Sequence, residues 1–201
     1  MRKLLLIPLL LAAGACDGGG GSTGGTDLTA AEAAQLNLAL FGMVAGLGPG
    51  AIGPDLRAQA WAVGDSFTIP VNEIVSCFSG SIGVDGTLTV QLDNTGQQLS
   101  MQATLEGTPN PCVHRMANGD LFTITGDPSL NVQISMAGNV DGQLSSLQVT
   151  ETGGFKWSSG ASSGTCAVNL TSSLNAASQV VTVSGTFCGF AVSNSFPIQQ
   201  A

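Results

Sequence analysis

The feature that most constrains this fold is a strict alternation of apolar and polar residues on either side of one turn. The apolar positions are Ile82, Val84, Leu88, Val90 and Leu92 before the turn, and Leu99, Met101, Ala103 and Leu105 after it. A period of two places successive side chains on opposite faces of a strand, so each segment has one apolar face and one wet face. The turn at Asp93-Asn94-Thr95-Gly96 predicts that the two segments pair as a hairpin.

Shorter alternating segments continue to the end of the chain. They are Phe122–Ile124, Leu130–Met136, Leu147–Val149, Phe155–Trp157, Val168–Leu170 and Val181–Val183. The connections are rich in Gly, Asn, Asp and Ser and too short for a helical crossover, so neighbouring strands should pair antiparallel. The pattern predicts a mainly β fold, an antiparallel meander of roughly eight to ten strands.

One apolar face per strand allows two arrangements: a sheet curved around a helix, or two sheets packed as a sandwich. We favour the curved sheet, because a capped helix precedes the strands. An exposed edge such as Val180–Val183 could also pair with a strand of an envelope protein partner.

The helix begins at a capping box, in which Thr29 and Glu32 each bond the backbone amide of the other. Its apolar stripe comprises Ala33, Leu36, Leu40, Met43, Val44 and Leu47. Gly46-Leu47-Gly48-Pro49-Gly50 ends it. Because the polar side carries no basic face for lipid head groups, the stripe predicts packing on the sheet. Residues 51–70 read as irregular, with Trp61 a core or rim residue near the helix.

The first sixteen residues have the layout of a secretory signal. Arg2 and Lys3 precede an apolar run, Leu4–Ala12, which is far shorter than the roughly 20 residues of a spanning helix. Ala13-Gly14-Ala15-Cys16 resembles the lipobox of bacterial lipoproteins. The resemblance implies that Cys16 is lipidated, that it begins the mature chain, and that the lipid anchors the protein to a membrane of the bacterial cell envelope. The alternative is an ordinary secretory signal that leaves Cys16 as a free or pairing thiol.

These signals divide the chain into three parts. Residues 1–15 are the expected signal peptide, and residues 16–27 are a flexible Gly/Ser linker that carries the lipid. Residues 28–201 are long enough for a single β-rich domain with its N-terminal helix. The domain is expected in the periplasm or outside the cell.

Charge is scarce and strongly acidic. Only 9% of the residues are charged. After the signal, three basic residues (Arg57, Arg115 and Lys156) stand against thirteen acidic ones, a formal net charge of −10. Such a chain repels polyanions, so nucleic acid is excluded as a partner.

Four cysteines remain after Cys16. An even number in an exported domain indicates disulfides. Of the three possible connectivities we favour sequential pairing, Cys77–Cys112 and Cys166–Cys188, because each pair then flanks neighbouring strands. A zinc site is the alternative, but no Cys-x-x-Cys pair is present, so we predict neither a metal nor a cofactor.

Catalytic motifs are missing from the sequence. His114 lies two residues from Cys112, and this pair could form a thiolate nucleophile only if Cys112 is not in a disulfide. There is no His-x-x-x-His, no Gly-x-Ser-x-Gly and no phosphate-binding glycine loop. Most acidic residues stand beside glycine, as turn residues do. We therefore predict no catalytic residue.

The sequence favours a non-enzymatic envelope lipoprotein with a binding or structural role. One alternative is a periplasmic carrier that holds a lipid or another apolar ligand between sheet and helix. Leu36, Leu40, Met43, Val44 and the inward strand residues would then line the binding space. A further alternative is a hydrolase whose carboxylates are brought together by the fold.

Overall fold

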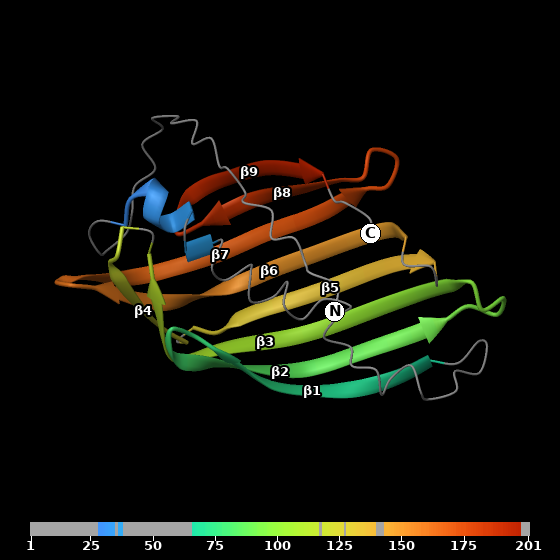
Figure 1. Ribbon diagram of the computed structural model, residues 1–201, viewed down its shortest axis with the longest axis horizontal. Helices are drawn as coiled ribbons and strands as arrows, with labels where there is room; N and C mark the ends of the chain where they lie inside the picture. The colour runs from blue at the N-terminus through green and yellow to red at the C-terminus, as the bar shows by residue number, and fades with distance from the viewer. Residues whose placement is uncertain are drawn as a thin grey trace, which may run out of the picture.

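The computed structural model describes residues 28–34, 36–37, 66–116, 118–126, 128–139 and 143–197, and within them it contains one antiparallel sheet and one short helix (Figure 1). The strands are β1 (Ser66–Ser76), β2 (Ser79–Leu92), β3 (Gln98–Arg115), β4 (Leu121–Thr125), β5 (Leu130–Asn139), β6 (Leu144–Ser159), β7 (Ser162–Asn175), β8 (Val180–Phe187) and β9 (Phe190–Pro197). The predicted fold class, mainly β with an N-terminal helix, is confirmed.

Strands that are neighbours in sequence are neighbours in the sheet. β4 and β5 share one position, since both lie between β3 and β6 and both pair antiparallel with them. Between β4 and β5, the amide of Gly126 donates a hydrogen bond to the carbonyl oxygen of Pro109 on β3, at 2.8 Å. The sheet is thus a meander of eight positions, with β1 and β9 at its edges.

The hairpin predicted around residues 93–96 is confirmed. β2 and β3 pair in continuous register from Leu92 opposite Leu99 to Ser81 opposite Asn110. The carboxylate of Asp93 closes the turn by accepting hydrogen bonds from the amides of Gln97 (2.9 Å) and Gln98 (3.0 Å). The hydrogen bond from the Thr95 hydroxyl has the largest effect in lowering the pKa of Asp93, and the bonds from the two amides lower it further.

Two expectations about strands are wrong. Val180–Val183 is not an edge, because Phe190–Pro197 forms β9 and pairs along β8. Residues 66–70 are not irregular: they begin β1, and Pro70 fits there because β1 is an edge strand.

The two segments Leu147–Val149 and Phe155–Trp157 belong to one long strand, β6. Gly153 makes this continuity possible. Its φ is 109°, and a Cβ at this position would lie 2.2 Å from the carbonyl oxygen of Ser129. Only glycine tolerates both conditions, so the strand passes a point at which any other residue would break the register.

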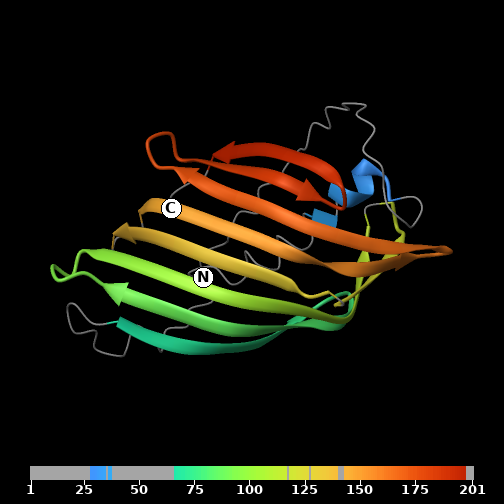
Figure 2. The ribbon, with the colours of Figure 1, turned by 180° about the vertical axis from the view of Figure 1, so that it is seen from behind.

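The helix covers residues 30–34 and 36–37 and lies at the end of the sheet where β4 is found (Figures 1 and 2). The capping box is confirmed: the Thr29 amide donates to Oε2 of Glu32 at 2.8 Å, and the Glu32 amide donates to Oγ1 of Thr29 at 3.3 Å. Ala33 and Leu36 are buried in the main core cluster. No helix among the described residues is long and apolar enough to cross a membrane.

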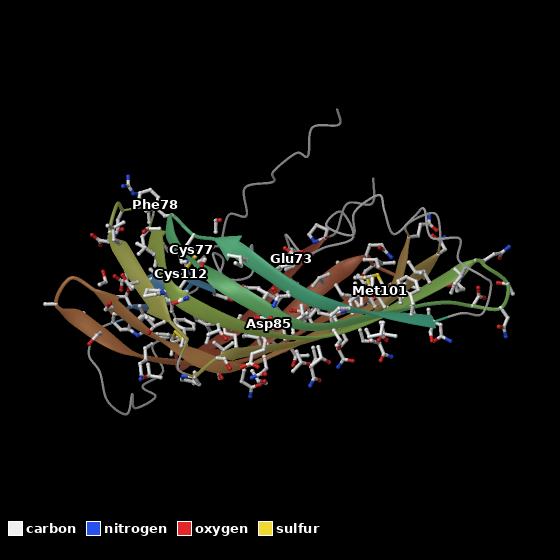
Figure 3. All side chains as sticks on the ribbon, turned by 90° about the horizontal axis from the view of Figure 1, so that it is seen from below. Glu73, Cys77, Phe78, Asp85, Met101 and Cys112 are labelled. Atoms are coloured by element: carbon white, nitrogen blue, oxygen red, sulfur yellow. A yellow bond between two sulfur atoms is a disulfide. The ribbon has the colours of Figure 1, made fainter. Side chains whose placement is uncertain are left out.

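The two faces of the sheet differ in chemistry, and Figure 3 shows them edge-on from the side of β1. On one face, apolar side chains from all eight positions lie in register. On the other face the residues are mostly hydroxyl and amide side chains, which we call the hydroxyl-amide face. One row of this face is Thr68, Thr89, Gln102, Ser135, Gln148, Ser173, Thr182 and Ser195. Hydroxyl pairs at both ends of the row are in contact: Thr68 with Thr89 at 2.8 Å and Thr182 with Ser195 at 3.1 Å.

Candidate functional site: the apolar face of the sheet

The apolar face is defined by rows of residues that the strand register places side by side. Its two middle rows are Ile69, Leu88, Ala103, Ile134, Val149, Ser172, Val183 and Asn194, and Val71, Gly86, Leu105, Val132, Glu151, Leu170, Gly185 and Val192. Hydrophobic side chains fill most of these positions. The face is therefore mainly apolar across the width of the sheet, and Glu151, Ser172 and Asn194 interrupt it.

One end of this face is a closed core. Phe122, Phe155 and Trp157 are buried there together with Ala33 and Leu36 of the helix. The ring centroids of Phe122 and Trp157 are 5.7 Å apart. Dense packing of this kind fixes the helix against the sheet but leaves little space for a ligand between them.

Beyond the helix the burial of the face is uneven, since Val90, Met101 and Val181 are buried there. Ala103, Ile134 and Leu147 pack against the core cluster but remain half-buried. They lie on three adjacent strands, β3, β5 and β6. This part of the face offers accessible apolar surface that a ligand can cover.

Glu151 stands in the middle of the apolar face, opposite Val132 of β5 and Leu170 of β7. Its side chain is 8% exposed. Among the described residues no hydrogen bond or ion pair satisfies its carboxylate. Burial raises the pKa of Glu151, because the apolar surroundings disfavour the charged form.

Ser172 is the second polar side chain in these rows that is buried, at 3% exposed. It lies opposite Val149, two residues along from the Glu151–Leu170 pair, so Glu151 and Ser172 are diagonal neighbours on one face. Within the described residues, no side-chain nitrogen or oxygen is both cut off from solvent and without a hydrogen bond. Because the Glu151 oxygens have no partner among the described residues, part of the carboxylate keeps contact with solvent.

Glu151 was not among the residues predicted to matter. The signal was present, since Val149, Glu151 and Phe155 share one parity in the sequence. A carboxylate at an inward position of a strand is the exception that marks a candidate site.

The cysteines lie at disulfide distance in the two pairs that sequential pairing predicts. The Cα atoms of Cys77 and Cys112 are 5.5 Å apart, and those of Cys166 and Cys188 are 4.2 Å apart. Each pair clamps the turn of an edge hairpin to the next strand inward, β1–β2 to β3 and β8–β9 to β7. Figure 3 labels the first pair.

His114 does lie beside Cys112, with Nε2 3.3 Å from Sγ. The Sγ atoms of Cys77 and Cys112 and a ring nitrogen of His114 all lie within 4.8 Å of one another. In the disulfide, however, neither sulfur is a thiolate, so the group can act neither as a nucleophile nor as a metal site. Burial lowers the pKa of His114, because its surroundings disfavour the imidazolium.

Two carboxylates face each other on the opposite side of the sheet. Asp85 and Glu106 are register partners on β2 and β3. Both are exposed. Asn72 donates a hydrogen bond to Asp85, and Ser129 donates one to Glu106 at 2.6 Å. A hydrolase would require carboxylates of this kind, but this pair stands on an open face and each member already has a partner.

A shallow hollow of about 340 Å³ lies on the hydroxyl-amide face. The polar residues that line it are Gln102, Thr104, Gln133, Ser135, Gln148 and Thr150. Five of these six residues are exposed. The hollow therefore offers hydrogen bonds but little enclosure.

Several predicted residues lie outside the described part of the chain. These are Cys16 and the rest of residues 1–27, together with Leu40, Met43, Val44, Leu47 and Trp61. Leu36 is described and is fully buried.

Comparison with known proteins adds no assignment: no protein-family model matches the chain, and neither a curated protein nor a solved structure matches it.

Proposed function

We propose that this chain is a non-enzymatic, lipid-anchored protein of the bacterial cell envelope, and that its curved sheet binds an apolar ligand on the apolar face. The observation that carries the proposal is the half-buried apolar surface beyond the helix, around Ala103, Ile134 and Leu147. A core that served only to stabilise the fold would be closed there, since exposed apolar surface lowers stability and solubility.

The anchor rests on the sequence of residues 13–16 and on the setting that disulfides require. An envelope protein partner is the competing occupant of the same surface. A hydrolase is the weaker alternative, because Asp85 and Glu106 are opposed but lie on an open face.

Binding to the apolar face is tested with Ile134→Asn. Ile134 is half-buried, so the substitution disturbs the accessible surface more than the core. We expect the dissociation constant of the neutral apolar dye N-phenyl-1-naphthylamine to rise about tenfold, because an amide on the face must be desolvated when the ligand binds. Fluorescence titration of the full chain carrying Cys16→Ser, which removes the lipid, measures this constant.

The matched control is Ser135→Asn. Ser135 is the next residue of β5 and lies on the hydroxyl-amide face. The Ser135→Asn substitution introduces the same side chain on the opposite side of the sheet and should leave dye binding unchanged. The proposal is wrong if the chain does not bind the dye saturably, or if both variants weaken binding equally.

The anchor is tested by intact mass spectrometry of the protein extracted from its native membrane. We expect an acylated chain that begins at Cys16, and a gain of about four mass units on reduction as two disulfides take up four hydrogens. An unmodified chain, or a mass that reduction does not change, contradicts the anchor or the disulfides respectively.

A further inference from the structure

The apolar face carries a polar spot that a purely apolar ligand does not need. Glu151 and Ser172 are both buried, lie on adjacent strands and are diagonal neighbours in the register. Hydrophobic residues surround them: Val149 beside them on β6, Val132 on β5 and Leu170 on β7. Ligand sites commonly combine an apolar lining with a few polar groups that fix the orientation of the ligand.

The Glu151 carboxylate has no counter-charge among the residues that the structure describes. Arg115 and Lys156 are the basic residues that the structure describes, and neither lies on the apolar face near Glu151. Arg115 lies over the ring of Phe78, 4.5 Å from its centroid, at the β1–β2 turn. Lys156 alternates with Phe155 and Trp157, so its side chain leaves β6 on the other face.

From this arrangement, and resting on the proposed function, we infer that the ligand of the apolar face carries a protonated amine that binds the carboxylate of Glu151 and the hydroxyl of Ser172. An ammonium group supplies the missing positive charge and three N–H donors. The carboxylate and the hydroxyl oxygen are acceptors for them. Hydrogen bonds between charged partners are the strong ones, and they strengthen further in apolar surroundings.

Other head groups fit this spot less well. A carboxylate or phosphate brings a second negative charge next to Glu151, and like charges repel. A hydroxyl can donate to Glu151 but leaves the buried negative charge uncompensated. The acidic net charge of the chain adds a weaker, long-range preference for cations in the same direction.

The inference is tested with three probes of one chain length, dodecylamine, dodecanol and dodecanoate, each competing with the neutral dye for the full chain carrying Cys16→Ser. We expect the amine to displace the dye at a concentration about tenfold lower than the acid does, with the alcohol between them. In Glu151→Gln the affinity for the amine should fall about tenfold, and the amine should no longer bind more tightly than the alcohol and the acid. The dye itself should bind as before, which shows that the variant is folded.

Glu73→Gln is the matched control, and Ser172→Ala is a second variant. Glu73 lies on the same face, opposite Val84, but it is exposed at the edge. The Glu73→Gln substitution removes the same charge without changing Glu151 or Ser172, so the chain should still bind the amine more tightly than the acid. Ser172→Ala should lower the affinity for the amine by a smaller factor than Glu151→Gln does, because it removes an uncharged hydrogen-bond acceptor.

The outcomes separate the two proposals. If the acid binds as tightly as the amine, or Glu151→Gln leaves the order of the probes intact, the amine inference is wrong while the apolar site stands. If Glu73→Gln abolishes the preference as well, the effect is one of overall charge and the assignment to Glu151 is wrong. If the dye does not bind at all, the proposed function fails, and the amine inference fails with it.

Discussion

Replacing the four disulfide cysteines by alanine lowers the free energy of unfolding by about 3–4 kcal/mol for each pair, on the chain-entropy account. The pairs close segments with sequence separations of 35 and 22 residues, so removing Cys77–Cys112 costs slightly more than removing Cys166–Cys188. Together the two losses reach about 7 kcal/mol, which is comparable to the whole stability of many domains. The variant without either pair should be largely unfolded at 37 °C.

Urea unfolding with and without a dithiol reductant measures this effect. The reductant should shift the midpoint of the wild-type chain and leave the midpoint of the four-alanine variant unchanged, because that variant has nothing left to reduce. Equal midpoints for the oxidised and reduced wild type would contradict the assigned role of the pairs.

Glu151→Leu should raise the free energy of unfolding by about 1–3 kcal/mol at neutral pH. The carboxylate gives up its hydration on folding and gains no partner among the described residues, whereas leucine restores the apolar row between Val132 and Leu170. A substitution in a buried position that stabilises the protein is unusual, since most core changes destabilise. It is expected here because the buried Glu151 carboxylate has no hydrogen bond or ion pair among the described residues.

The stability gained by Glu151→Leu should increase as the pH rises. Burial raises the pKa of Glu151 above its value in the unfolded chain, so the folded state holds this proton more tightly. The stability from this proton is fully present below the unfolded pKa and is lost as the pH rises through the folded pKa. The advantage of Glu151→Leu is therefore smallest in acid and grows until the pH exceeds the folded pKa.

Urea unfolding of both proteins at a series of pH values, from acid to above neutrality, measures this dependence. Glu73→Leu, an exposed change on the same face, should alter stability by no more than about 0.5 kcal/mol. An advantage of Glu151→Leu that does not vary with pH would show that Glu151 does not titrate as its burial requires.

Much of the sheet could be predicted because local chemistry agrees with the final structure. In β2 and β3 the alternation persists for many residues and a tight turn joins the two strands, so the register follows from the sequence. The capping box of Thr29 and Glu32 involves residues only three apart and needs no tertiary information.

The existence of β9 and the continuity of β6 depended on tertiary pairing. Phe190–Pro197 alternates weakly, and it becomes β9 because β8 offers it an unpaired edge. Leu147–Val149 and Phe155–Trp157 were predicted as separate segments, yet the positive φ of Gly153 lets one strand continue past Ser129. In both cases the neighbouring strand determines the structure.

The candidate site was harder to predict than the fold, because it depends on register between strands. Glu151 and Ser172 are 21 positions apart in the sequence, and only the pairing of β6 with β7 makes them neighbours. Asp85 and Glu106 meet in the same way. Sequence alone identified the apolar face, but it could not identify which polar residues interrupt it.

The hydroxyl-amide face has a consequence for the conditions that this protein tolerates. Serine, threonine and glutamine side chains neither gain nor lose a proton between mild acid and mild alkali. Because these side chains are uncharged, salt does not screen them. The row from Thr68 to Ser195 therefore keeps the same hydration when acidity or ionic strength changes. A surface of lysine and glutamate would not, since its solubility follows its net charge. The hydration of this row is therefore insensitive to changes of salt and acidity that would alter the hydration of a charged surface.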